Sequence, residues 1–531
     1  MAVLFISVQC IAAEQVVLRV AVTEKGKDGP LPCRAWVQAG DDRLFEPISP
    51  DATPYAKDRS FSCDGSFDIK VPAGQVTVHV ERGKEYYPVD RVVDVAEDGS
   101  TQVDIKLERW IDMAADGWYS ADLHVHFGSD KLDVLKQLAL ADDVNWVPAF
   151  SYWNQFEKDW PHSPENEHVF ADPTHFVSRA NEEIERIGGG PFESVGALFI
   201  FGLPKPVYVE KHTHTFPPDA VLAGIAKKMD RKCLIDTDKP LWAENVVTMA
   251  MGHFDSVQVC HNHYHREQTI HDAGLCCGMA SSVIEEEPER YAEEELFHRT
   301  NGVYYRWLNC GFRLAATGGS AIGVMAVPLG YNRTYAYISG EPTPEKYIEA
   351  VRDGRTFATS GPMLRTKADD MLPGATIRFK SRGLAAIKIE TVLESIEPIE
   401  SIEYVLNGVV VRRSMLRGKK FEGVLREQFN MNFRPQRSGW LLCRATYRNP
   451  HDGKLRQAHT SPFYFEVDRK PTAFRKDAEY MIRWIDELLK VAAKPDRYEN
   501  EEQRREAIKL FNEARQVYTN IANDATRIWG D

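Results

Sequence analysis

The period of the hydrophobic pattern changes along this chain of 531 residues, and those changes limit what it can fold into. Residues 14–110 and 371–468 consist of short runs in which apolar and polar residues alternate, the pattern of half-buried strands. Residues 111–370 alternate strand-like and helix-like stretches, whereas residues 469–531 carry helical spacing alone. A chain of this length exceeds one ordinary core. The sequence therefore predicts a multidomain α/β plus β protein. A small antiparallel β-sandwich and a second β-sandwich flank a central α/β domain, and a helical hairpin follows.

Turn and cap residues delimit some elements sharply. Thr343 is a good N-cap, Pro344 suits the first position of a helix, and Gly354 suits the position just after its end. Asn407-Gly408 predicts a tight hairpin between two short strands. The strands predicted in the central segment cover residues 120–125, 146–150, 197–201, 232–235, 256–260 and 314–316.

The N-terminal run of residues 1–13 is apolar and ends in small residues, like the hydrophobic and cleavage regions of a signal peptide. The basic residues that normally precede such a run are missing, so a buried first strand is the alternative. We expect an exported protein, periplasmic or secreted, in which this run is the remnant of a signal peptide. Cys33 and Cys63 lie in the following segment and could form a disulfide after export.

Net charge limits the partners. The formal net charge is -13 at pH 7, which argues against nucleic acid or an anionic membrane, because both require a basic face. After residue 13, no stretch approaches the roughly 18 apolar residues that a membrane-spanning helix needs. We therefore expect a small-molecule or carbohydrate substrate, no nucleic acid and no membrane span.

The most specific chemical feature is His124-Val125-His126, at the end of a predicted strand. Side chains two positions apart on a strand project from the same face, so both imidazoles can reach one metal ion. A histidine pair satisfied by hydrogen bonds is the structural alternative. Further candidate ligands along the chain favour the metal site.

Polar clusters follow two other predicted strands, where α/β barrels keep their functional groups. The carboxylates Asp236 and Asp238 and Lys239 follow one of them, and His263 follows the next. The run at residues 181–185 adds carboxylates, among them Glu183, although such a run is most often the solvated face of a helix. Zinc, manganese or iron accepts imidazole and carboxylate together and lowers the pKa of bound water toward neutrality. Because the chain has no nucleophile elbow, Walker-type loop or dinucleotide fingerprint, we expect metal-assisted chemistry.

Two motifs resemble known families. Asp122-Leu123-His124-Val125-His126 resembles the first motif of the PHP (polymerase and histidinol phosphatase) superfamily. Residues 331–335 and 354–362 resemble the C-terminal signature of its CehA/McbA-type metallohydrolases. This resemblance covers residues 117–364. It implies a distorted (β/α)7 barrel with a metal cluster at the C-terminal ends of its strands, which hydrolyses ester, carbamate, amide or phosphoester bonds. Asp64-Gly65-Ser66-Phe67 followed by Val71-Pro72-Ala73-Gly74 resembles the carboxypeptidase-regulatory-like domain, which residues 14–110 would form and to which we assign no chemistry.

The chain departs from the PHP pattern at several ligand positions. Residues 151–154 read Ser-Tyr-Trp-Asn where the family has Thr-Asp-His-Asn, and Ala197 stands where a histidine is expected. Residues 319–323 replace the late Ser-Asp-x-His. The resemblance therefore implies a reduced ligand set that holds one divalent ion, or two. Its members are His124, His126, Glu183, Asp236 and His263.

The function expected from these features is that of an exported metal-dependent hydrolase. A metal-bound water would attack an ester, carbamate, amide, phosphoester or carbohydrate-derived substrate at a site completed by Asp236. Lys239 and Ser320 would act as electrophile or substrate contacts. The tryptophans Trp153, Trp160, Trp242 and Trp307 would suit a sugar or an aromatic ring, although tryptophans are ordinarily core residues.

Two other functions stay open on sequence alone. The barrel could be a non-catalytic carbohydrate-binding or ligand-binding protein, or the metal could serve a lyase in which Lys239 or a histidine is the base. The C-terminal helices would pack within the chain or, alternatively, form an oligomer contact.

Overall fold

A computed structural model describes residues 15–531 except 41, 50–51, 55–57, 98, 127–130, 154–166, 187–194, 208, 210–212, 267–291, 382–385, 417–422 and 451. Residues 1–13, expected to be the remnant of a signal peptide, lie outside the described residues. The chain divides into two compact units. Unit 1 comprises Met1–Asp112 and Leu140–Asp143, and unit 2 comprises Met113–Ala139 and Val144–Asp531.

Unit 1 consists of two β-sheets whose apolar side chains share one core. One sheet has the order β5 (Ser66–Pro72), β1 (Gln15–Glu24), β8 (Ser100–Leu107), and the other has β3 (Thr53–Pro54), β4 (Phe61–Cys63), β2 (Cys33–Ala39), β6 (Gly74–Glu81), β7 (Val89–Val95). Phe67, Ile69 and Val71 are buried in alternation along β5, as the period of two predicts. The prediction that this unit is antiparallel throughout is wrong at one pair, since β1 and β8 run parallel. Most of the unit separates these two strands in sequence, so no tight turn fixes their relative direction.

The two cysteines of unit 1 lie opposite each other. Cys33 on β2 is the register partner of Cys63 on β4, and both thiols are buried. Their Sγ atoms are 3.6 Å apart, and both cysteines are free. The structure thus brings together the pair that the sequence singled out, in the thiol form.

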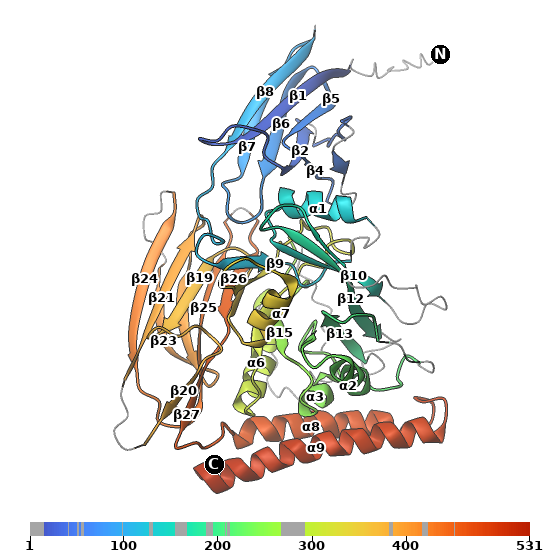
Figure 1. Ribbon diagram of the computed structural model, residues 1–531, viewed down its shortest axis with the longest axis vertical. Coiled ribbons are helices and arrows are strands. Elements are labelled where there is room, and N and C mark those ends of the chain that lie inside the picture. Colours follow the sequence, from blue (N-terminus) through green and yellow to red (C-terminus); the bar gives the residue numbers. More distant parts are fainter. Residues whose placement is uncertain are drawn as a thin grey trace, which may run out of the picture. The chain divides into compact units, whose positions relative to one another are not determined.

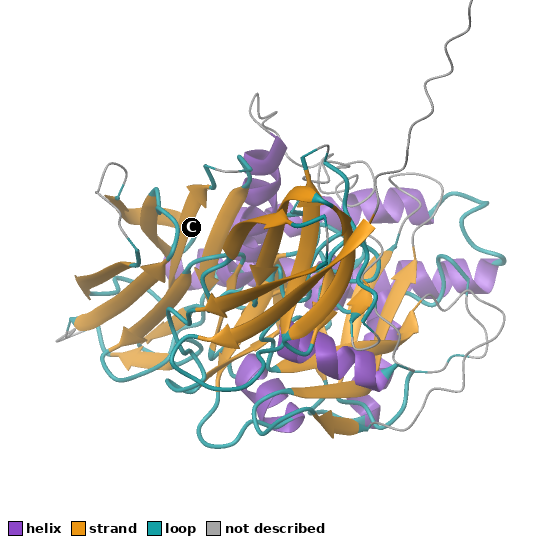
Figure 2. Cartoon of the chain, turned by 90° about the horizontal axis from the view of Figure 1, so that it is seen from above, coloured by secondary structure: helices purple, strands orange, loops and turns teal. Residues whose placement is uncertain are grey.

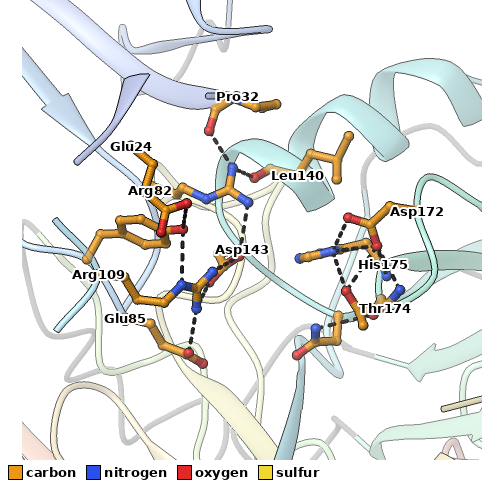
Figure 3. Close-up of polar contacts among 12 residues, drawn as sticks. Glu24, Pro32, Arg82, Glu85, Arg109, Leu140, Asp143, Asp172, Thr174 and His175 are labelled. Atoms are coloured by element: carbon orange, nitrogen blue, oxygen red, sulfur yellow. Dashed lines mark hydrogen bonds and ion pairs between the residues drawn. The ribbon is translucent and has the colours of Figure 1, made fainter. Parts of the chain in front are cut away.

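Buried charges form ion pairs inside unit 1. The Arg34 guanidinium donates from Nε to Asp142 Oδ1 (2.8 Å) and from Nη2 to Asp142 Oδ2 (2.5 Å), and both side chains are almost fully buried. Arg82 and Arg109 both donate to Asp143, at 3.1 and 3.2 Å (Figure 3). A buried ion pair of this kind is satisfied only while both partners are present.

Unit 2 is built on one long sheet and a smaller one. The long sheet has the order β16 (Ala315–Gly318), β15 (Ser256–Cys260), β14 (Leu234–Asp236), β13 (Gly196–Phe201), β12 (Phe176–Arg186), β10 (Trp146–Trp153), β9 (Trp118–Ala121), β17 (Arg333–Tyr337), β18 (Thr356–Thr359), β26 (Leu455–Thr460), β25 (Gly439–Arg448), β22 (Ser401–Leu406), β23 (Val409–Met415). Off this path, β11 (His168–Phe170) pairs with β12, and β20 (Thr376–Phe379) pairs with β27 (Phe463–Val467). The smaller sheet is β19 (Met363–Ala368), β21 (Ile387–Ser395), β24 (Leu425–Phe433). Because β18 pairs with β26, the strands predicted as a separate C-terminal sandwich continue the sheet of the α/β region.

The helices are α1 (Leu132–Ala141), α2 (Asp219–Met229), α3 (Asn245–Ala250), α6 (Ala292–Asn309), α7 (Pro344–Arg352), α8 (Arg475–Ala492) and α9 (Glu501–Trp529). Helix α7 begins as predicted: Thr343 Oγ1 accepts a hydrogen bond from the Lys346 amide, and Gly354 beyond its end has φ +73°. The Asn407-Gly408 hairpin is also confirmed, with positive φ at both residues. None of the described helices is long and apolar enough to cross a membrane.

The C-terminal helices α8 and α9 lie side by side (Figure 1). Their apolar faces join the main core of unit 2. Trp484 Nε1 donates to the Ala243 carbonyl (3.1 Å), and the Tyr518 hydroxyl donates to the Val246 carbonyl (3.0 Å). The packing of this hairpin within its own chain, one of the two predicted fates, is therefore observed.

The coarse prediction of an α/β plus β protein is confirmed, but among the described strands the sheet ladder does not close into a barrel. Strands predominate over helices (Figure 2). Strand β13 runs antiparallel to both β12 and β14, which departs from strict β/α alternation. Just after β9, Val125 forms single parallel bridges with Ala149 and with Ile322, so it lies between the two flanks of the sheet.

One buried histidine of this sheet predicts a pH effect on stability. His459 on β26 donates from Nδ1 to the Thr460 carbonyl (2.9 Å) and accepts from the Tyr305 hydroxyl at Nε2 (2.9 Å), which holds it neutral. Burial, together with the charge of Arg444, lowers the pKa of His459 from 6.5 to about 3. The unfolded chain therefore takes up a proton as the pH falls below 6.5, whereas the folded chain does not until about pH 3.

His459 should accordingly cost the fold about 2 kcal/mol between pH 7 and pH 5. We expect the variant His459→Gln to lose this part of the acid sensitivity, so that its unfolding free energy falls less steeply over that range. Urea unfolding at several pH values measures both slopes. Equal slopes for the variant and the native chain would show that His459 is not protonated on unfolding.

Candidate metal centre

The two histidines of the His-x-His motif lie directly after β9 and face one another. Their Nε2 atoms are 2.8 Å apart. Glu183 on β12 approaches the same point, with Oε2 at 3.1 Å from His126 Nε2 and Oε1 at 3.9 Å from His124 Nε2. One ligand atom from each of the three residues lies within 4.8 Å of the others. This two-histidine, one-carboxylate group could hold a metal ion, and its donor set is one that zinc, manganese and iron accept.

The end of β9 is fixed by the residue at the start of the motif. Asp122 accepts hydrogen bonds from the amides of His124 (3.1 Å), Ser320 (2.8 Å) and Gly330 (2.8 Å). Burial raises the pKa of Asp122 to about 6, although these amides oppose the shift. Gly319 packs so closely that a Cβ there would lie 2.5 Å from the Cβ of His124. Only glycine fits this approach, so residues 319–320 help to position the first histidine.

Glu183 comes from a strand and not from a helix. Residues 181–185 belong to β12, so the expectation of a solvated helix face is wrong. Pairing with β10 and β13 on either side buries the run despite its acidic composition. Burial, followed by the charges of Glu185 and Asp238, raises the pKa of Glu183 well above its ordinary value.

The electrostatic setting suits a cation. Burial, followed by the neighbouring His126 and Lys239, lowers the pKa of His124 well below its ordinary value, so its imidazole stays neutral. Only a neutral imidazole can offer a lone pair to a metal. The buried Oε2 of Glu183 accepts no hydrogen bond. A buried carboxylate in that state is costly, and a divalent cation would compensate it.

Aromatic rings wall the group. The His124 ring lies 4.5 Å from the Phe199 ring, and the His126 ring lies 5.4 Å from the Phe150 ring, centroid to centroid. Both phenylalanines are buried. These apolar walls keep water from one side of the site and thereby strengthen the electrostatic interactions within it.

Asp236 and His263 do not join the three-residue group. Asp236 Oδ2 accepts hydrogen bonds from the hydroxyls of Ser256 (2.5 Å) and Thr317 (2.6 Å), so this carboxylate holds neighbouring strands together. Burial raises the pKa of Asp236 to about 7. His263 contributes to the lowered pKa of His124, which places it in the surroundings of the pair but outside the ligand group.

The two predicted substrate contacts have other partners. Lys239 is buried, and its Nζ lies 2.6 Å from Asp238 Oδ2 and 5.2 Å from the Trp242 ring. The Ser320 hydroxyl donates to the Asn332 carbonyl (3.0 Å) and accepts from the Asn332 amide (3.0 Å). Both side chains therefore have structural bonds near the site.

The tryptophans expected to line a substrate cleft divide into two groups. Trp242 and Trp307 are buried core residues, and Trp307 stacks on Trp484. The side chains of Trp153 and Trp160 lie outside the described residues. Of the four tryptophans expected to line a cleft, the two whose side chains are described, Trp242 and Trp307, are therefore core residues.

The carboxylate beside the group that the sequence did not single out is Asp238. Its Oδ1 lies 3.5 Å from His124 Nδ1. The sequence offered two carboxylates in this segment, and spacing alone could not separate them, because positions 236 and 238 have the same parity on a strand. A left-handed turn at Asp238 (φ +54°) distinguishes it from Asp236, which ends β14.

No protein-family model matches this chain, and no curated protein or solved structure matches it either. The site is therefore defined by its own geometry as a candidate centre for a divalent metal ion.

Proposed function

We propose that the protein is a metal-dependent hydrolase of the PHP type, with a reduced ligand set, exported to the periplasm or secreted. The observation that carries the proposal is the buried group of His124, His126 and Glu183. The bridges of Val125 to both flanks of the sheet support a distorted barrel with this group at its strand ends. The substrate would be a small molecule with an ester, carbamate, amide or phosphoester bond, or a carbohydrate derivative.

Different residues of the chain would bind the ion, supply negative charge and exclude solvent. His124 and His126 would bind the ion through Nε2, and Glu183 would supply the negative charge. A divalent ion held there polarises a carbonyl or phosphoryl group and lowers the pKa of water toward neutrality. Phe150 and Phe199 would exclude solvent from one side of the reacting centre.

The arrangement around Lys239 argues against this residue as the base of a lyase reaction. Burial lowers the pKa of Lys239, but the charge of Asp238 and its hydrogen bond outweigh burial, so the net pKa is raised. An ammonium group held in this way does not accept a proton. The proposed function therefore assigns Lys239 no role as a base.

Metal analysis of the purified native chain tests the proposal. We expect about one equivalent of zinc, manganese or iron per chain, as a single mononuclear centre requires. Hydrolysis of chromogenic carboxyl and phosphate esters should be lost on dialysis against a chelator and should return when the metal is added back. A chain that binds no divalent ion but retains a sugar from a carbohydrate panel would instead be a binding protein.

A further inference from the structure

Asp238 lies beside the candidate metal centre and is held there by hydrogen bonds. It lies two residues beyond β14 and is fully buried. Its Oδ2 accepts hydrogen bonds from Lys239 Nζ (2.6 Å) and Trp242 Nε1 (2.8 Å). These two donors fix the carboxylate from one side and leave Oδ1 directed elsewhere.

The free side of this carboxylate faces the first histidine. Asp238 Oδ1 lies 3.5 Å from His124 Nδ1, and neither atom has a hydrogen-bond partner. The opposite ring nitrogen, Nε2 of His124, faces His126 and Glu183. The imidazole of His124 is thus placed between a carboxylate and the proposed ligand position.

We propose that Asp238 is a positioning residue that holds the His124 ring with Nε2 toward the metal ion, and that Lys239 and Trp242 act by fixing Asp238. The inference rests on the proposed metal centre. A carboxylate that faces Nδ1 favours the tautomer with the proton on that nitrogen, which leaves the Nε2 lone pair for the metal. Lys239 thereby has a role that does not require it to touch substrate.

Cobalt(II) binding to variants of the full chain tests this inference. Affinity is measured by competition with a chromogenic chelator, and the visible spectrum of bound cobalt reports the geometry of its ligands. We expect Asp238→Ala to weaken cobalt binding about 10- to 100-fold and to change the spectrum, as loss of an outer partner of a ligand does. Asp238→Asn keeps an acceptor oxygen and should restore part of the loss.

Asp236→Asn is the matched control. Asp236 is equally buried and is not in the ligand group. Its Oδ2 accepts hydrogen bonds from Ser256 and Thr317, and its Oδ1 accepts one from the Asp238 amide (3.1 Å), for which the asparagine keeps an oxygen. This variant should bind cobalt as the native chain does. Trp242→Phe keeps an aromatic ring and removes one hydrogen bond to Asp238, so it should weaken cobalt binding, but less than Asp238→Ala does. It also tests the positioning role if the alanine variant does not fold.

The outcomes separate the two proposals. A native chain that binds no cobalt would overturn the metal centre itself. A native chain that binds cobalt, together with folded Asp238 variants of equal affinity and spectrum, would overturn only the positioning role. An equal loss in Asp236→Asn would also overturn it, because the effect would then belong to any buried carboxylate of this segment.

Discussion

The double variant His124→Ala/His126→Ala is expected to purify without bound metal and without chelator-sensitive hydrolysis. Two of the three groups that meet within 4.8 Å are imidazoles, so this variant leaves Glu183 alone. Even the loss of a residue that only orients a ligand weakens a metal site 10- to 100-fold. Removing two ligands should therefore lower affinity by more than about 10⁴-fold. Metal content and chelator competition measure the loss.

A second double variant provides its control. His168 and His175 are also histidines paired with carboxylates, at 3.0 Å from Glu345 and 2.8 Å from Asp172, the latter drawn in Figure 3. Neither belongs to the ligand group. His168→Ala/His175→Ala should keep both metal and activity. If it loses metal as completely as the first variant, the ion is not held by the His-x-His motif.

The variant Asp142→Ala should destabilise unit 1 by about 3–5 kcal/mol, the range for breaking a buried ion pair. The Arg34 guanidinium is fully buried and donates two hydrogen bonds to Asp142. Without that carboxylate its charge stays in the protein interior, where Asp58, at a longer 3.6 Å, compensates it only in part. Because a chain with more than one unit need not unfold in one step, urea unfolding should be combined with hydrogen exchange on peptides from β2 and β6.

The apolar replacement of both partners distinguishes charge from packing. Arg34→Met/Asp142→Leu removes the two charges together and keeps most of the volume, a change that is often neutral or stabilising. We expect this double variant to recover most of the stability lost in Asp142→Ala. If it is as unstable as the single variant, the site depends on the hydrogen-bonded shape of the pair and not on charge balance.

The parts of the fold that could be predicted from sequence are those specified by neighbouring residues, such as helix caps and turns. Helix α7 is specified by its own cap and by glycine, and the β22–β23 hairpin by Asn407-Gly408. The pairing of β18 with β26 joins residues about a hundred positions apart, and no local pattern encodes it. The direction of β8 beside β1 is a similar case.

In the candidate site, too, local spacing identified some residues and could not rank others. His124 and His126 were predictable as a pair because side chains two positions apart in an extended chain project to the same side, although the two residues flank the single bridges of Val125 beyond the end of β9. Glu183 was found by spacing, although the run around it was expected to be helical. Asp236 and Asp238 could not be ranked, because the spacing does not show that the chain turns at Asp238 (φ +54°) and so gives the two side chains different directions.

The pairing of β18 with β26 limits how this gene could be shortened or recombined during evolution. One edge of β18 pairs with β26, which lies beyond residue 450. A chain truncated after residue 370 would therefore expose the unpaired amide and carbonyl groups of this edge, which are a template for aggregation. The region that carries the candidate metal centre and the strands that follow it would then be gained, lost or exchanged between proteins only as one piece.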